Sequence, residues 1–342
     1  MGGLSYLLAL LLLCLVSGSL SSKELGLDLG IEMKSTPELP VRILTHNIRY
    51  ATSSPFQGER PWADRRQLLL NELQFNTRHI QESFICLQEV LHVQLIDILS
   101  WLNNNASATT ASDSLQWTYI GVGRDDGHEA GEYSPIFYRP AIWKLLHWET
   151  VWLSETPTKP SKGWDAASIR IVTIGLFRHH ASRKTVLALN THLDDQGSRS
   201  RFEAARIILG KINEYLTGED GKSISGIFLS GDLNSEETQE AYKTLTAPTS
   251  PLVDTQKLVD PAERYGNENT FTGFGYEGLP PTRIDYILVG PASKPDTNST
   301  QGQNHTGSLP WTAQGYAVLA NRFDDGVFNS DHRAVIADVV LA

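Results

Sequence analysis

The stretch "GIFLSGDLNSEET" (226–238) places two polar side chains directly after a buried strand. The apolar run "GIFLS" is typical of a strand, and Asp232 and Asn234 follow it two residues apart. Residues two apart on an extended chain point to the same side, so we expect Leu233 between them to face the core. A buried strand end tolerates a carboxylate and a carboxamide when they bind or activate something. We interpret "GDLN" as a catalytic strand end, with a Gly–Asp turn as the alternative.

Polar residues stand beside other apolar runs in the same way. They are Asn47 in "THNI", Glu89 in "LQEV", His192 in "NTHLDD", Asp285 in "RIDYI", and Asp331 and His332 in "SDHRAV". Each residue alone has an ordinary interpretation, such as a cap for a turn or helix, a surface ion pair or a buried structural histidine. Their joint occurrence favours a pocket of carboxylate, amide and imidazole groups at one side of a sheet.

The chemistry of this set favours a hard metal ion. Oxygen ligands without cysteine suit Mg²⁺, Mn²⁺ or Ca²⁺ better than Zn²⁺. Mg²⁺ usually takes one or two carboxylates and keeps several water ligands. Glu89 and Asp331, with the carbonyl oxygen of Asn47, would form such a sparse set, and the reaction that fits it is phosphoester hydrolysis.

Hydrophobic patterning predicts a mixed α/β domain from residue 41 to residue 342, with sheets covered by helices. The predicted strands are 41–48, 83–90, 134–140, 168–177, 184–192, 225–231, 283–290 and 332–341. Helices are predicted from Pro61, from Leu91 to about Leu102, and along the apolar face from Phe202 to Leu216. The run "WKLLHWETVWL" (143–153) is interpreted either as strand or as an exposed apolar hairpin.

Six motifs carry a resemblance to a known superfamily. They are "THNIRY", "LQEV", "NTHLDDQGSRSR", "LSGDLN", "RIDYILV" and "SDHRAV", in that order. The chain resembles the endonuclease/exonuclease/phosphatase (DNase I-like) superfamily of metal-dependent phosphohydrolases. The block "GVGRDDGHEAGEYSPIFYRP" (121–140) is similar to a bacterial and fungal branch. The resemblance implies a four-layered α/β sandwich, with two mixed β-sheets face to face and helices outside.

The resemblance also implies roles for the matched residues. Asn47, Glu89 and Asp331 would hold Mg²⁺ or Mn²⁺. Asp232 and Asn234 would position the attacking water, with Asp232 as the base or as a ligand to a second metal. Asp285 would orient His332, and an imidazole that donates a proton or an N–H lowers the barrier for attack on an anionic phosphate. His332 and His192 are the two candidates for that donation.

The loop "GRDDG" and the segment after it have no single interpretation. Arg124 would contact a substrate phosphate, but two acids and two glycines also make an ordinary turn. Tyr133 in "GEYSPIFY" has the same two interpretations, substrate contact or structure.

Charge limits the substrate classes only mildly. The formal net charge is −10 and the sequence pI is about 5.5, which disfavours a protein that holds nucleic acid on a broad basic face. A nucleic acid, a phosphomonoester and a phospholipid headgroup all remain candidate substrates, and sphingomyelinase-like or inositol-phosphate phosphatase activity is an alternative to nuclease activity. A non-catalytic secreted binding protein on the same fold is the alternative from another class; the presence of every matched motif residue disfavours it.

The N-terminus predicts secretion. Residues 1–22 are uncharged, with an apolar run from Leu7 to Val16 followed by small residues, which is typical of a signal peptide; 23–40 form a polar lead-in. N-glycosylation sequons stand at Asn105, Asn298 and Asn304. We expect a secreted, extracellular monomer without a stable protein partner.

Cysteine usage gives one further expectation. Removal of the leader would leave Cys86 as the single cysteine, so no intramolecular disulfide can form and the core must supply the stability. We expect Cys86 to be a small buried residue on a strand rather than a nucleophile.

Overall fold

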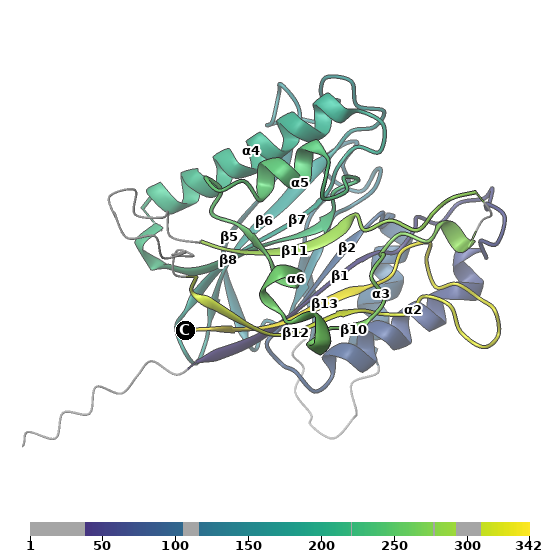
Figure 1. Cartoon of the computed structure of the whole chain (residues 1–342), viewed down its shortest axis with the longest axis horizontal. Coiled ribbons are helices and arrows are strands. Elements are labelled where there is room, and N and C mark those ends of the chain that lie inside the picture. The colour runs from purple at the N-terminus through teal and green to yellow at the C-terminus, as the bar shows by residue number, and fades with distance from the viewer. Residues whose placement is uncertain (1–37, 105–115, 220, 276–277, 292–308) are drawn as a thin grey trace, which may run out of the picture. The chain divides into compact units, whose positions relative to one another are not determined.

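A computed structural model describes residues 38–104, 116–219, 221–275, 278–291 and 309–342. Two β-sheets lie face to face in this part of the chain (Figure 1). The predicted leader and the sequons at Asn105, Asn298 and Asn304 lie outside the described residues. In the part that the structure describes, no helix has the length and apolar character needed to span a membrane.

The seven-stranded sheet contains both ends of the described domain. In spatial order its strands are β10 (Tyr265–Gly266), β12 (Trp311–Val318), β13 (Val335–Leu341), β1 (Leu39–Asn47), β2 (Ser83–Gln88), β4 (Ile136–Tyr138) and β3 (Thr118–Ile120). The sheet is mixed because β1 pairs parallel with β2 and antiparallel with β13.

The six-stranded sheet is also mixed. In spatial order its strands are β5 (Trp143–Trp152), β6 (Ile171–His179), β7 (Thr185–His192), β8 (Ile224–Asp232), β11 (Asp285–Gly290) and β9 (Val253–Asp254). Strand β8 pairs parallel with β7 and antiparallel with β11. Strand β5 is an edge strand paired along its length with β6, so the run 143–153 is strand rather than a free apolar hairpin.

Helices cover the outer face of each sheet. They are α2 (Trp62–Thr77), α3 (His92–Asn104), α4 (Ser198–Thr217) and α5 (Glu240–Leu245). The single turn α6 (Thr255–Leu258) instead contacts β11 of one sheet and β12 of the other. Figure 1 shows α4 and α5 over the six-stranded sheet and α2 and α3 beside the seven-stranded sheet. Apolar residues of α4 pack on the first of these sheets and those of α2 and α3 on the second.

The layer between the sheets is a third apolar core. Phe84 of β2 contacts Phe177 of β6 and Phe228 of β8, with ring centroids 5.1 and 5.2 Å apart. Two sheets that share this core, each covered outside by helices, form the four-layered α/β sandwich that the resemblance predicted, and that prediction is confirmed. Cys86 is fully buried on β2, and burial raises the pKa of its thiol to about 12, as expected for a structural cysteine.

Candidate active site

Strands of both sheets bring their ends to one edge of the sandwich. Strand β1 ends at Asn47 beside the end of its parallel neighbour β2, which Glu89 follows directly. In the other sheet, His192 at the end of β7 lies opposite Asp232 at the end of β8. Asp285 also lies opposite Asp232, because it begins the antiparallel strand β11. The topology therefore places five of the predicted residues together.

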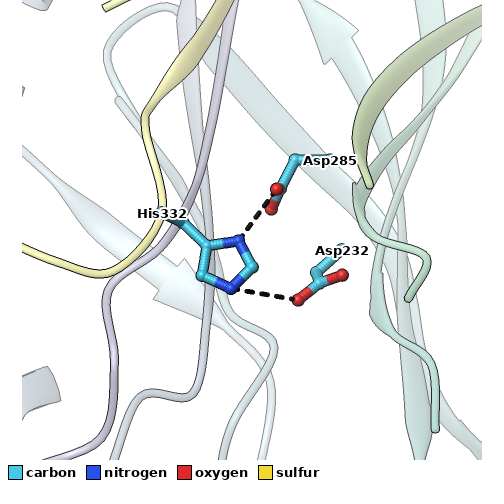
Figure 2. Close-up of side chains that lie close together, drawn as sticks. All are labelled: Asp232, Asp285 and His332. Atoms are coloured by element: carbon cyan, nitrogen blue, oxygen red, sulfur yellow. Dashed lines mark hydrogen bonds and ion pairs between the residues drawn. The ribbon is translucent and has the colours of Figure 1, made fainter. Parts of the chain in front are cut away.

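His332 lies between two buried carboxylates (Figure 2). Its Nδ1 atom is 2.8 Å from Oδ2 of Asp285, and its Nε2 atom is 3.7 Å from Oδ2 of Asp232. The backbone N–H of Asp285 donates to Oγ1 of Thr270, which fixes the start of β11 at this point. The pairing of Asp285 with His332, 47 residues apart, is the arrangement that the resemblance implied.

Electrostatics makes this histidine a cation. Burial lowers the pKa of His332, but the negative charges of Asp285 and Asp232 outweigh it and raise that pKa to about 10. Burial, and next the charge of Asp285, raises the pKa of Asp232 above its ordinary value. An imidazolium donor therefore stands beside a carboxylate with increased basicity.

The same three side chains also carry atoms of the kind that ligate metal ions. Among the described residues, one potential ligand atom from each of Asp232, Asp285 and His332 lies within 4.8 Å of the others. The hydrogen bond between His332 and Asp285 already occupies Nδ1, so we interpret the group as a hydrogen-bonded charge network.

Asn234 fixes the second histidine. Its backbone N–H donates to Oδ1 of Asp232 at 2.8 Å, and its φ of 45° turns the chain after the strand. Its Nδ2 atom donates to the carbonyl of Leu193 and lies 3.1 Å from Nε2 of His192. Since the amide nitrogen is the donor, Nε2 of His192 accepts and the ring proton is on Nδ1. Burial, and next the charge of Arg170, lowers the pKa of His192 to about 4, so this imidazole is neutral at pH 7.

The side chain of Asn47 joins the two sheets. Its Nδ2 atom donates to Oε1 of Glu89 at 3.1 Å and to Oδ2 of Asp232 at 3.0 Å. Its Oδ1 atom accepts from the backbone N–H of Arg49. The amide presents its nitrogen to the two carboxylates and its oxygen to Arg49, and the role of Asn47 as a metal ligand stays a prediction. Asn47 therefore positions Glu89 and Asp232.

Glu89 and Asp331 are two acidic side chains whose charges interact at this edge, with the guanidinium of Arg49 beside Glu89. Glu89 has a φ of 59°, a conformation that a non-glycine residue adopts at a cost and that is frequent at functional sites. Burial raises the pKa of Asp331, and the charge of Glu89 raises it further, despite the cationic His332. Oγ of Ser330 donates to the carbonyl of Asn47 at 2.6 Å and lies 3.3 Å from Oδ1 of Asp331. Two carboxylates whose charges interact, without a sulfur ligand, fit Mg²⁺ or Mn²⁺.

Arg124 is linked to His192 through Glu132. Its guanidinium makes a bidentate pair with Glu132, at 2.7 and 2.8 Å, and Oε2 of Glu132 is 3.5 Å from Nδ1 of His192. Tyr133 is buried, and its hydroxyl donates to the carbonyl of His128. The structure therefore brings Arg124 to the site through Glu132, and it gives the Tyr133 hydroxyl a structural partner.

Arg49 belongs to the "THNIRY" motif, but its position in the sequence predicts no role for it. Its φ is 57°, and its Nη1 atom is 3.7 Å from Oε2 of Glu89. The fully buried Arg65 of α2 donates to the carbonyls of Ile48 and Arg49, which holds the turn after β1. A positive φ directly after a strand is a feature of the folded chain that the letters "NIR" do not reveal.

Two aspartates, Asp194 and Asp195, follow His192 in the loop after β7. The carboxylate of Asp194 accepts five hydrogen bonds, from four backbone N–H groups and from Nε of Arg170. Asp195 pairs with Nη2 of the same arginine at 2.8 Å. This cluster fixes the loop that leaves β7 at His192.

Comparisons place the fold among known structures. No protein-family model and no curated protein sequence matches the chain. An endonuclease/exonuclease/phosphatase from Bacteroides vulgatus is 30% identical, with 89% of this chain and 100% of that chain covered and a TM-score of 0.70. An endonuclease/exonuclease/phosphatase family protein from Bacteroides thetaiotaomicron is 27% identical, covering 90% and 97%, with a TM-score of 0.73. A mannosyl-6-phosphatase from Bacteroides thetaiotaomicron is 28% identical, covering 88% and 100%, with a TM-score of 0.71.

These matches extend over nearly the whole described domain. The chain therefore belongs to the endonuclease/exonuclease/phosphatase family of phosphoester hydrolases.

Proposed function

We propose that this protein is a secreted, divalent-metal-dependent hydrolase that releases phosphate from a sugar phosphomonoester. The observation that carries the proposal is the meeting of Asp232, the cationic His332 and the Glu89–Asp331 pair at one edge of the two sheets. Acid, base and cation-binding groups in one place are what attack of water on an anionic phosphate requires.

The choice of a small phosphomonoester has two supports. The mannosyl-6-phosphatase is similar to this chain over the full length of that enzyme. The net charge of −10 disfavours binding to a long polyanion, because nucleic-acid affinity depends on phosphate contacts from Lys and Arg. Secretion is supported by the uncharged, apolar N-terminal segment.

The side chains at this edge either take part in the proposed reaction or position those that do. Asp232 accepts a proton from the attacking water, and its raised pKa makes it a stronger base than an ordinary aspartate. Asn234 holds that carboxylate through its backbone N–H. The imidazolium of His332 donates a hydrogen bond to a phosphate oxygen while Asp285 fixes its orientation. His192 is neutral, so its Nδ1–H and Nε2 act in positioning rather than as a charge.

The cation completes this set. A divalent cation held by Glu89 and Asp331 would neutralise charge on the phosphate oxygens and lower the pKa of a bound water. Asn47 orients the Glu89 carboxylate toward that position through its amide nitrogen.

A substrate panel tests the proposal. Purified wild-type protein with Mg²⁺ is assayed for phosphate release from mannose 6-phosphate and an inositol phosphate, for phosphocholine release from sphingomyelin, and for nicking of supercoiled plasmid. EDTA, Glu89→Gln and Asp232→Asn are the negative controls. Glu203→Gln, which removes a surface carboxylate paired with Arg206 on α4, is the matched control.

We expect release from mannose 6-phosphate that EDTA, Glu89→Gln and Asp232→Asn abolish and Glu203→Gln leaves intact. Nicking or phosphocholine release without monoester hydrolysis would show that the substrate is a phosphodiester rather than a sugar phosphomonoester. No hydrolysis of any substrate by folded, metal-loaded protein would favour the non-catalytic binding protein.

A further inference from the structure

An aromatic side chain is held in an exposed position beside the site. Phe56 is 65% exposed, yet its backbone is fixed at both ends of a tight turn. Its N–H donates to Oε2 of Glu59 at 2.9 Å, and its carbonyl accepts from the N–H of Glu59 at 3.0 Å. The Glu59 side chain is only 1% exposed, so this turn is anchored by a buried carboxylate.

Gly58, two residues after Phe56 in the same turn, is also constrained. Gly58 has a φ of 85°, and a Cβ atom there would lie 3.0 Å from the carbonyl oxygen of Phe274. Only glycine suits this close approach. The loop that carries Phe56 is therefore packed against the loop at Phe274, and the ring is presented to solvent from a fixed backbone.

One guanidinium connects Phe56 to the acidic pair. The Cζ atom of Arg49 lies 4.9 Å from the centroid of the Phe56 ring and 4.2 Å from that of Tyr50. The Nε atom of the same arginine donates to Oε1 of Glu59, and its Nη1 atom is 3.7 Å from Oε2 of Glu89. One face of the Phe56 ring thus rests on the cation that borders the predicted metal site.

Packing does not explain a phenylalanine here. Two other exposed phenylalanines also contact an arginine, Phe75 with Arg78 and Phe202 with Arg206, but both lie on helices within one turn of their partner. Such neighbours on a helix surface need no further reason. Phe56 differs because a buried anchor holds it in a loop at the edge of the site, with most of its area in water. Rigid aromatic side chains at the rim of a pocket are typical ligand contacts.

We propose that Phe56 is a specificity-determining residue, against which the sugar ring packs while its phosphate lies at Glu89 and Asp331. The inference rests on the proposed function, and it names the part of the substrate that this loop recognises. A sugar presents an apolar C–H face of a size that matches a phenyl ring, so contact removes apolar area of both from water. Arg49, which itself stacks on Tyr50, lies against one face of the Phe56 ring and restrains it.

Kinetics of Phe56→Ala with two substrates tests this inference. Mannose 6-phosphate offers a ring, and methyl phosphate offers the same phosphoester without one. We expect kcat/KM for mannose 6-phosphate to fall about tenfold, mainly through KM, relative to any change with methyl phosphate. Phe56→Tyr should retain most of the wild-type preference for mannose 6-phosphate over methyl phosphate. Phe75→Ala, which removes an equally exposed ring from α2, should leave that preference unchanged.

A binding readout separates contact from catalysis. In the Asp232→Asn protein with Mg²⁺, saturation of aromatic protons should transfer to the ring protons of mannose 6-phosphate by NMR, and Phe56→Ala added to this variant should remove most of the transfer. Matching thermal midpoints exclude unfolding as the cause.

The outcomes are distinguishable. If wild-type protein releases phosphate from mannose 6-phosphate and Phe56→Ala leaves the ratio of the two substrates unchanged, the inference is overturned and the proposed function stands. An equal loss with both substrates also overturns it, because the loop would then support the catalytic groups. If wild-type protein hydrolyses neither substrate, the proposed function fails and this inference fails with it.

Discussion

Replacement of Asp285 by Asn tests the buried carboxylate behind His332. Asn keeps the size of the side chain and removes its charge from a fully buried position 2.8 Å from Nδ1 of His332. The charge of Asp285 is the largest influence that raises the pKa of His332, which goes from 6.5 to about 10. Without that charge the pKa of His332 falls, so the histidine loses its proton at a lower pH.

The expected losses follow from these contacts. Removing one partner of a buried ion pair costs about 3–5 kcal/mol of unfolding free energy. Loss of one charged donor to a phosphate oxygen reduces kcat by about 10²–10³. The sign of the pH effect is fixed: a raised pKa in the folded state stabilises the protein fully below pH 6.5, and this stabilisation is lost as pH rises through about 10. The gap in stability between wild type and variant should therefore narrow toward high pH.

The assay is kcat for mannose 6-phosphate from pH 5 to pH 10 at one saturating Mg²⁺ concentration, with urea unfolding in parallel. A cation beside Asp331 opposes protonation of His332, so the prediction concerns the difference between the two proteins. We expect kcat of Asp285→Asn to fall on the basic side of the pH profile at a lower pH than kcat of wild type. The matched control is Asp254→Asn on β9, which removes a buried carboxylate paired with Arg283. It should cost stability without moving the basic limb of the pH profile. An Asp285→Asn enzyme within threefold of wild type, with the same basic limb, would refute the reasoning.

Three further predictions follow from other parts of the molecule. Mg²⁺ should raise the thermal midpoint of wild-type protein, because it relieves the repulsion between Glu89 and Asp331; Glu89→Gln should lose this rise, and a rise equal to wild type would contradict the site. Asp194→Asn should lower the unfolding free energy by about 2 kcal/mol at pH 7, since hydrogen bonds from backbone N–H groups overcome burial and lower the pKa of Asp194 to about 2. That deficit, measured by urea unfolding, should disappear as pH falls through about 2, and a deficit independent of pH would contradict this origin. The protein secreted by a eukaryotic host should lose apparent mass on treatment with an N-glycosidase, and an unchanged mass would show that Asn105, Asn298 and Asn304 are not used.

Much of the fold could be predicted because its strands are apolar on both faces. Strands such as β7 and β8 are buried on both faces between two layers, so continuous runs such as "TVLALNTH" mark them clearly. Strand β12 was missed because only three of its eight residues are buried and a bulge between Ala313 and Gly315 interrupts its alternation. The boundary at β1 was predicted two residues late, since Leu39 and Pro40 already pair with β13.

The site was predictable as a set of residues but less so as a geometry. Polar residues after apolar strands indicated which side chains would gather, because the ends of parallel strands and the starts of antiparallel ones meet at one edge. The direction in which an amide points depends on its neighbours, and the N–H of Arg49 turns the oxygen of Asn47 away from the carboxylates. The contact of Glu132 with His192 also depends on loops from distant parts of the chain, and residue spacing carries no signal for it.

Hydrolysis of mannose 6-phosphate in ¹⁸O-labelled water tests the central claim most directly. The account predicts that wild-type protein with Mg²⁺ releases phosphate carrying one ¹⁸O atom and mannose carrying none, and that EDTA or Asp232→Asn suppresses this release at least a hundredfold. Label in the mannose, or release that persists undiminished in EDTA and in Asp232→Asn, would contradict it.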